Sequence, residues 1–148
     1  MDLFIHDNVS DAVERLRHPQ TGAPLIAARG NDRELMVISD DGQRIAFTDP
    51  VGPLDSPFTR LRVLDRAAGR VVTVFSDEPV TVFRHLSFSA DGEVLAFATR
   101  ASLLPAQDTD LTDDVYSYRP ADESLRLESV DGDGAQGAGS RLSPKRRN

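Results

Sequence analysis

Apolar and polar residues alternate along two stretches that lie fifty positions apart, from Met36 and from Leu86. The first reads "MVISDDGQRIAF" and the second "LSFSADGEVLAF", each with an Asp-Gly pair at its centre. A period of two is typical of strands with one buried face. Asp-Gly between two such runs predicts a tight hairpin, because glycine adopts a positive φ without strain. The residues expected on the buried faces are Met36, Ile38, Ile45, Phe47, Leu86, Phe88, Leu95 and Phe97.

Each hairpin is followed by two further strand-like segments, since residues 59–75 align with 113–129. The repeat unit is therefore a four-stranded meander of about fifty residues, the period of a β-propeller blade. Residues 1–18 repeat only the second half of this unit. The sequence thus predicts one all-β domain over residues 1–128, an incomplete ring of about two and a half blades. Its parts are a half blade at 1–18 and full blades at 34–76 and 84–129, followed by a flexible Gly/Ser-rich tail at 129–148.

The segment "SDAVERLRH" has a competing interpretation. Val9, Ala12, Val13 and Leu16 have helical spacing, and Ser10 could cap the helix. The corresponding segment of the next unit is the β-branched run at 71–74, which favours a strand.

The hairpin "FSADGEVLAFAT" resembles the WD-like repeat of TolB-type β-propellers. Residues 100–140 resemble a bacterial subgroup with an acidic loop, an aspartate before the third strand and a Gly-Ser-rich exit. The resemblance implies a binding platform of several blades, usually in exported proteins or beside a peptidase domain. For a full-length parent it implies a periplasmic or extracellular location.

The departures from that family matter too. Propellers have at least four blades, whereas this sequence supplies two and a half, and its tail stops where another inner strand should begin. We expect either a piece of a larger propeller or an assembly of copies. The first strand, residues 3–7, should leave an open edge through which self-association could occur.

The net charge of −7 disfavours nucleic acid and anionic membranes as partners. The chain contains no cysteine, which removes disulfides, thiol nucleophiles and cysteine metal sites. Its apolar runs are too short for membrane insertion, and the acidic start is unlike a signal peptide.

An acidic loop, "QDTDLTDD", is the main candidate for a site. Asp108, Asp110, Asp113 and Asp114 could supply oxygen ligands to a weakly bound calcium ion. The spacing does not fit an EF-hand, because the sixth position has no glycine and the twelfth is Arg119. The alternative is a structural turn in which Asp113 or Asp114 caps backbone amides.

The remaining motifs favour structural roles. "GDGAQG" at 132–137 matches a nucleotide-binding pattern, but acidic residues surround it and no helix follows. His85 could face a central channel. The side chains of Asp41 and Asp91 are expected to cap their own turns, and Tyr116 and Tyr118 to pack between blades.

No residue pattern indicates a catalytic centre or a cofactor. The sequence predicts a non-catalytic binding or scaffold module that presents loops, chiefly 101–114, to a protein or small ligand. One alternative is a fragment of the gating propeller of a prolyl oligopeptidase-type serine peptidase, which would need a G-x-S-x-G segment that these residues lack. The other is a calcium-stabilised surface module.

Overall fold

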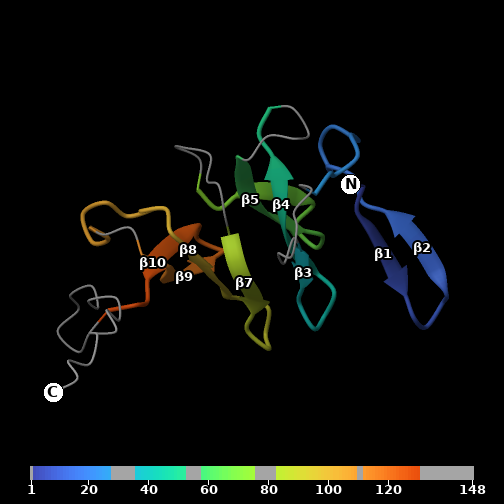
Figure 1. The fold of residues 1–148 in the computed structure, drawn as a ribbon. Helices are drawn as coiled ribbons and strands as arrows, with labels where there is room; N and C mark the ends of the chain where they lie inside the picture. Colours follow the sequence, from blue (N-terminus) through green and yellow to red (C-terminus); the bar gives the residue numbers. More distant parts are fainter. Residues whose placement is uncertain (1, 28–35, 53–57, 76–82, 110–111, 131–148) are drawn as a thin grey trace, which may run out of the picture.

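The computed structural model describes residues 2–27, 36–52, 58–75, 83–109 and 112–130, in which all regular structure is β (Figure 1). The N-terminal hairpin consists of β1 (Phe4–Asp7) and β2 (Ala12–Arg15). The middle sheet contains, in spatial order, β3 (Met36–Ile38), β4 (Arg44–Pro50), β5 (Thr59–Asp65) and β6 (Arg70–Thr73). The third sheet contains β7 (Phe83–Phe88), β8 (Leu95–Thr99), β9 (Asp114–Arg119) and β10 (Ser124–Leu127).

The three sheets follow one another in chain order, with the middle sheet between the other two (Figure 1). Every pairing is antiparallel between consecutive strands, so each four-stranded sheet is a meander. The two meanders and the separate hairpin confirm the all-β fold, and they do not close into a ring. The expected tail lies outside the described residues from position 131 onward. Among the described residues, no helix has the length and apolarity needed to cross a membrane.

Residues 12–15 form a strand, so the helical alternative is wrong. The Asp7 carboxylate accepts hydrogen bonds from the backbone of Val9 at 2.8 Å and of Ser10 at 3.2 Å. These bonds fold residues 8–11 into a turn, and Asp11 takes a φ of 57° within it. The turn returns β2 alongside β1, and the ladder from Phe4 opposite Arg15 replaces helical hydrogen bonds.

The two Asp-Gly hairpins have a wider loop than a two-residue turn. In the first, the backbone N–H of Ser39 donates to Arg44 at 2.9 Å, which encloses four loop residues. Gly42 takes a φ of 69°, and its N–H donates to Ser39 at 2.8 Å. The second hairpin repeats both bonds from Ser89 and Gly92. The prediction of hairpins with a positive-φ glycine is confirmed, although the loops are two residues longer than the tightest turn.

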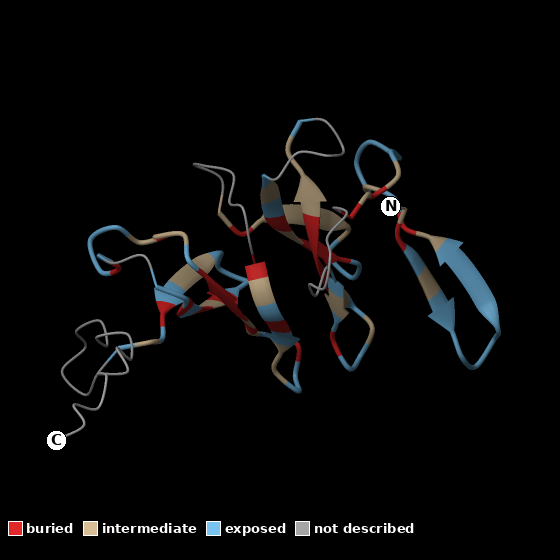
Figure 2. Ribbon diagram, viewed as in Figure 1, coloured by how far each residue is buried: buried red, intermediate tan, exposed pale blue. Residues whose placement is uncertain are grey.

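The middle sheet has buried residues on both of its faces, because four consecutive residues of β4, 45–48, are buried (Figure 2). One face packs on the base of the N-terminal hairpin and on the segment at 24–27 that is bridged to it. The N-terminal core formed there contains Leu3, Leu16, Leu25, Ala27, Ile45, Phe47 and Leu64. The other face packs on the third sheet in the C-terminal core, which contains Ala46, Leu61, Val63, Val74, Phe83, Leu86, Leu95, Phe97, Leu103, Tyr116, Tyr118 and Leu127. Because side chains alternate along a strand, Phe47 enters one core while Ala46 enters the other. The expectation of a single buried face is wrong for this sheet.

Met36 and Ile38 were expected in a buried face, but each side chain is 44% exposed. They lie directly opposite Phe47 and Ile45, on the face toward the N-terminal hairpin. That hairpin contributes only two strands, and these do not reach over β3 as a complete sheet would. The repeat pattern gave the correct face, but the surface that would cover it is missing among the described residues.

The two equivalent loop glycines allow a test of the hairpin contact. Gly42 and Gly92 share a φ of 69°, but a Cβ on Gly92 would lie 3.1 Å from Ser39 Cβ, whereas a Cβ on Gly42 would meet nothing within 4 Å. We expect Gly42→Ala to lower the free energy of unfolding by about 1–2 kcal/mol through φ alone. Gly92→Ala should cost more. Denaturant unfolding of both variants checks this, and equal losses would contradict the contact between the two loops.

Candidate binding surfaces

The loop between β8 and β9 is held by buried polar contacts. The Tyr116 hydroxyl donates to the Asp108 carboxylate and accepts a bond from the Leu103 backbone at 3.2 Å. The Ser102 hydroxyl donates to the Asp108 carbonyl at 2.7 Å. Tyr116, Asp108 and Leu103 are all buried. Buried polar groups that are fully paired rigidify the segment that carries them, so this loop has a defined shape.

The outer part of the loop faces solvent. The backbone N–H groups of Gln107 and Asp108 both donate to the Leu104 carbonyl at 2.8 Å, which closes a turn. Pro105, Ala106 and Gln107 are exposed at its tip. The loop therefore presents a short, small-residue surface on a fixed base.

The four carboxylates of the calcium hypothesis do not share a common centre as far as they are described. Asp108 accepts from Tyr116, and Asp114 accepts from the Ser129 hydroxyl at 2.5 Å. Asp113 lies 3.4 Å from both Arg84 and Arg100. Asp110 lies outside the described residues, and among those that are described no group of three potential ligands could hold a metal ion. The calcium site stays a prediction.

Tyr116 and Tyr118 pack between the middle and third sheets, as expected. The Tyr116 ring stacks on Phe97 with centroids 5.8 Å apart. Burial, together with the hydrogen bond to Asp108, raises the pKa of Tyr116 well above its usual value, and burial raises the pKa of Tyr118 to about 12. Both phenols thus stay protonated near neutral pH. The sequence identified their packing but not the role of the Tyr116 hydroxyl in the loop.

The Asp41 and Asp91 side chains cap their own turns, as the sequence predicted. Asp41 accepts from the Ser39 hydroxyl at 2.5 Å and from the Gln43 backbone at 3.0 Å, and Asp91 makes the same contacts with Ser89 and Glu93. The serine bond, followed by the backbone bond, lowers the pKa of each carboxyl. Because a lowered pKa favours the ionised form, the caps contribute above the ordinary carboxyl range and weaken as the pH falls through the lowered pKa.

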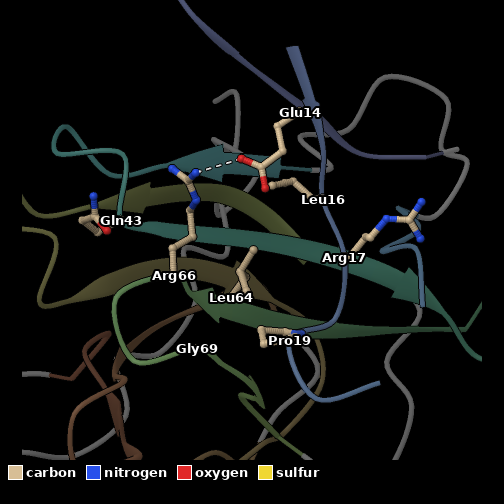
Figure 3. A pocket seen from close by; sticks show the side chains of 8 residues that line it. All are labelled: Glu14, Leu16, Arg17, Pro19, Gln43, Leu64, Arg66 and Gly69. Atoms are coloured by element: carbon tan, nitrogen blue, oxygen red, sulfur yellow. Dashed lines mark hydrogen bonds and ion pairs between the residues drawn. The ribbon is translucent and has the colours of Figure 1, made fainter. Parts of the chain in front are cut away.

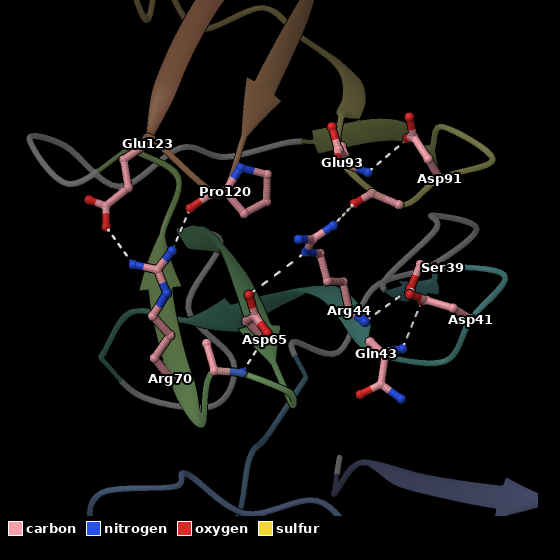
Figure 4. Close-up of polar contacts among 12 residues, drawn as sticks. Ser39, Asp41, Gln43, Arg44, Asp65, Arg70, Asp91, Glu93, Pro120 and Glu123 are labelled. Carbon is pink, nitrogen blue, oxygen red and sulfur yellow. Dashed lines mark hydrogen bonds and ion pairs between the residues drawn. The ribbon is translucent and has the colours of Figure 1, made fainter.

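Two arginines of the middle sheet bind backbone carbonyls of the third sheet (Figure 4). Arg44 donates to the Gly92 carbonyl at 2.7 Å, and Arg70 donates to the Pro120 carbonyl at 2.6 Å. Arg70 also lies 3.1 Å from the Glu123 carboxylate. These contacts hold two turns of the third sheet against the middle sheet. The sequence analysis did not identify either arginine. The aligned positions of the next repeat are Val94 and Ser124, and this difference between the repeats could have indicated a special role for Arg44 and Arg70.

A shallow cleft of about 380 Å³ separates the N-terminal hairpin from the middle sheet (Figure 3). An ion pair of 3.1 Å between Glu14 and Arg66 spans it, and the Gln20 amide donates to the Gly69 carbonyl at 2.9 Å. Its lining combines the apolar Leu16 and Leu64 with the charged Glu14 and Arg66. These contacts join the hairpin to the middle sheet. The described residues that line the cleft do not include a nucleophile paired with a base.

The outer face of the third sheet points away from the middle sheet. It corresponds to the face of the middle sheet that packs on the third sheet, but it is polar. A hollow of about 320 Å³ on this face is lined by Val94, Ser117, Tyr118, Arg119, Ser124, Arg126 and Glu128. The repeat aligns these residues with Arg44, Val63, Leu64, Asp65, Arg70, Val72 and Val74 of the middle sheet. Where the middle sheet has valines, this face has Ser117 and Glu128, which are joined at 2.5 Å. This face is therefore more polar than its counterpart on the middle sheet.

The three histidines lie in three different elements and contact different residues. His6 contacts Asp11 at 2.8 Å on the surface, and His18 lies in the turn that follows β2. His85 is exposed on β7 with a φ of 54°, at an irregularity between Arg84 and Ser87. In the described part of the chain none of them has a hydrogen bond to a serine. The "GDGAQG" segment lies outside the described residues.

The two tyrosines provide a matched test of the loop anchor. Tyr116→Phe removes a donor from buried Asp108 and an acceptor from Leu103, and should lower the free energy of unfolding by about 1–3 kcal/mol. Tyr118→Phe removes a hydroxyl that has no hydrogen-bond partner among the described residues, and should change stability little or raise it. Denaturant unfolding and proteolysis within residues 101–109 distinguish them. Equal losses would contradict an anchoring role for the Tyr116 hydroxyl.

Comparison with known proteins supports the fold. No family model matches the chain, and no curated protein matches its sequence. TolB from Acinetobacter baumannii is similar in structure with a TM-score of 0.53 and 13% identity, over 85% of this chain and 26% of that one. The tricorn protease is similar with a TM-score of 0.52 and 10% identity, over 88% of this chain and 11% of that one.

This chain spans about a quarter of the TolB structure and about a tenth of the tricorn protease. Both are propeller-containing proteins, and the resemblance to TolB-type repeats is thereby supported at the level of the fold. The middle and third sheets are β-propeller blades, and the N-terminal hairpin is half of one.

Proposed function

We propose that the chain is a non-catalytic binding module of TolB-like β-propeller blades, which presents the loop at residues 101–109 to a protein or small ligand. The observation that supports it is the loop anchor formed by Tyr116, Asp108 and Leu103. Burying a carboxylate is costly unless it is hydrogen-bonded. The paired carboxylate therefore fixes the base of the loop, and a loop with a fixed base can present a constant surface to a partner.

A rigid loop lowers the entropic cost of binding. Side chains and loops that are ordered only on association reduce the affinity, whereas a preformed surface avoids that loss. The exposed tip at Pro105, Ala106 and Gln107 carries no charge. Its small side chains suit a partner that makes backbone and apolar contacts.

The similarity to the tricorn protease favours a second candidate. In that case the blades would be part of the propeller of a longer peptidase, in which they would restrict access to a separate catalytic domain. This candidate requires a hydrolase segment in the same polypeptide.

Photo-crosslinking can test the binding proposal. A photoreactive amino acid at Ala106 should give a discrete adduct in the cells that make the protein, detected by intact-mass measurement. The same amino acid at Ala90, an exposed alanine in the second hairpin loop, should not. Tyr116→Phe should reduce the Ala106 adduct, because the loop loses its anchor. The absence of an Ala106 adduct, or the same adduct at both positions, would contradict the proposal.

A further inference from the structure

The two interfaces between sheets use aligned residues of different size. Leu64 on β5 and Tyr118 on β9 occupy aligned positions of the middle and third sheets. Tyr118 is 1% exposed and belongs to the C-terminal core, whereas Leu64 lines the cleft between the N-terminal hairpin and the middle sheet. Because leucine is shorter than tyrosine, this interface lacks the volume of one aromatic ring at that place.

The opposite wall of the cleft also differs from the aligned wall of the second interface. β2 follows its turn as β6 does, and Glu14 on β2 therefore aligns with Val72 on β6. Val72 packs against the C-terminal core. The Glu14 side chain is instead 62% exposed and reaches across the cleft to Arg66 (Figure 3). The cleft thus combines an apolar floor, Leu16 and Leu64, with an ionic rim.

The charged groups that line the cleft do not balance. They are one carboxylate, Glu14, and two guanidinium groups, Arg17 and Arg66, so the lining is net positive in a chain of net charge −7. Arg66 also donates to the Gly42 carbonyl at 3.2 Å, and Arg17 donates to the Gly22 carbonyl at 3.0 Å. Each guanidinium has five N–H donors, so both keep donors for a further acceptor. The exposed pair of Glu14 and Arg66 is weak, and a carboxylate from solution can compete with it.

We propose that this cleft binds a small aromatic carboxylate. The ring lies on Leu16 and Leu64, in the place that the Tyr118 ring takes at the second interface. The carboxylate accepts from the Arg66 guanidinium, whose planar fork suits paired hydrogen bonds to such a group. The cleft volume of about 380 Å³ falls within the usual range of small-molecule sites, roughly 300–1,000 Å³. The cleft is separate from the 101–109 loop, so either proposal can fail without the other.

Phenylacetate is a suitable probe, because it joins one aromatic ring to one carboxylate. We expect saturable binding to the full chain, with NMR shift changes at the methyl groups of Leu16 and Leu64. Acetate lacks the ring and should leave those methyl groups unchanged. Phenethylamine carries the ring with the opposite charge and cannot accept from Arg66, so it should bind at least about tenfold more weakly. No saturable binding of phenylacetate, shift changes elsewhere, or equal results with either control compound would overturn the proposal.

Two arginine variants separate recognition from folding. Arg66→Ala removes the partner of the carboxylate and should reduce the affinity for phenylacetate about tenfold, the loss of one charge-assisted hydrogen bond. Arg84→Ala is the matched control, since Arg84 is an ion-paired arginine with 40% of its side chain exposed, against 33% for Arg66. The control should leave binding intact. Equal effects of the two variants would rule out recognition by Arg66.

A third variant tests the shape of the cleft. Leu64→Tyr places in the cleft the ring that the aligned position of the third sheet carries, and it should abolish the binding of phenylacetate. Circular dichroism and the unfolding midpoint report whether this variant keeps the fold, and the arginine pair decides the proposal if it does not. A folded Leu64→Tyr variant that binds phenylacetate as the wild type does would contradict the proposal.

Discussion

The structure depends on the burial of the middle sheet between two neighbours. Antiparallel sheets commonly have one solvated face, but here consecutive residues of β4 serve different cores. Ile45 and Phe47 pack against the N-terminal hairpin, while Ala46 packs against the third sheet. On β5, Leu61 and Val63 face the third sheet and Leu64 faces the hairpin. One strand pair thus joins all three sheets.

The two faces of the middle sheet are joined to their neighbours differently. Toward the third sheet, an apolar core is supplemented by Arg44 and Arg70, which donate to backbone carbonyls and so fix where the next sheet lies. Toward the N-terminal hairpin, a smaller core is supplemented by the exposed pair of Glu14 and Arg66. Exposed ion pairs contribute little to stability. The C-terminal interface should therefore be the stronger one.

The fold was largely predictable from the sequence because its signals are local and occur twice. Asp-Gly with alternating apolar residues predicted both hairpins, and the repeat predicted the meander order. The exposure of Met36 and Ile38 was not predictable, since a pattern shows which face a side chain takes but not whether a neighbour covers it. The hydrogen bond that anchors the 101–109 loop was not predictable for a related reason. Only the folded chain brings the Tyr116 hydroxyl to Asp108, and an acidic run gives no indication of which carboxylate turns inward.

Amide hydrogen exchange across the three sheets tests the central claim most directly, because it reports how each strand opens. If the middle sheet is held from both sides, the paired amides of β4 and β5 should exchange only by global unfolding. Those of β1 and β2 should exchange faster through local opening of the hairpin. Exchange of β4 and β5 as fast as that of β1 and β2 would contradict the account.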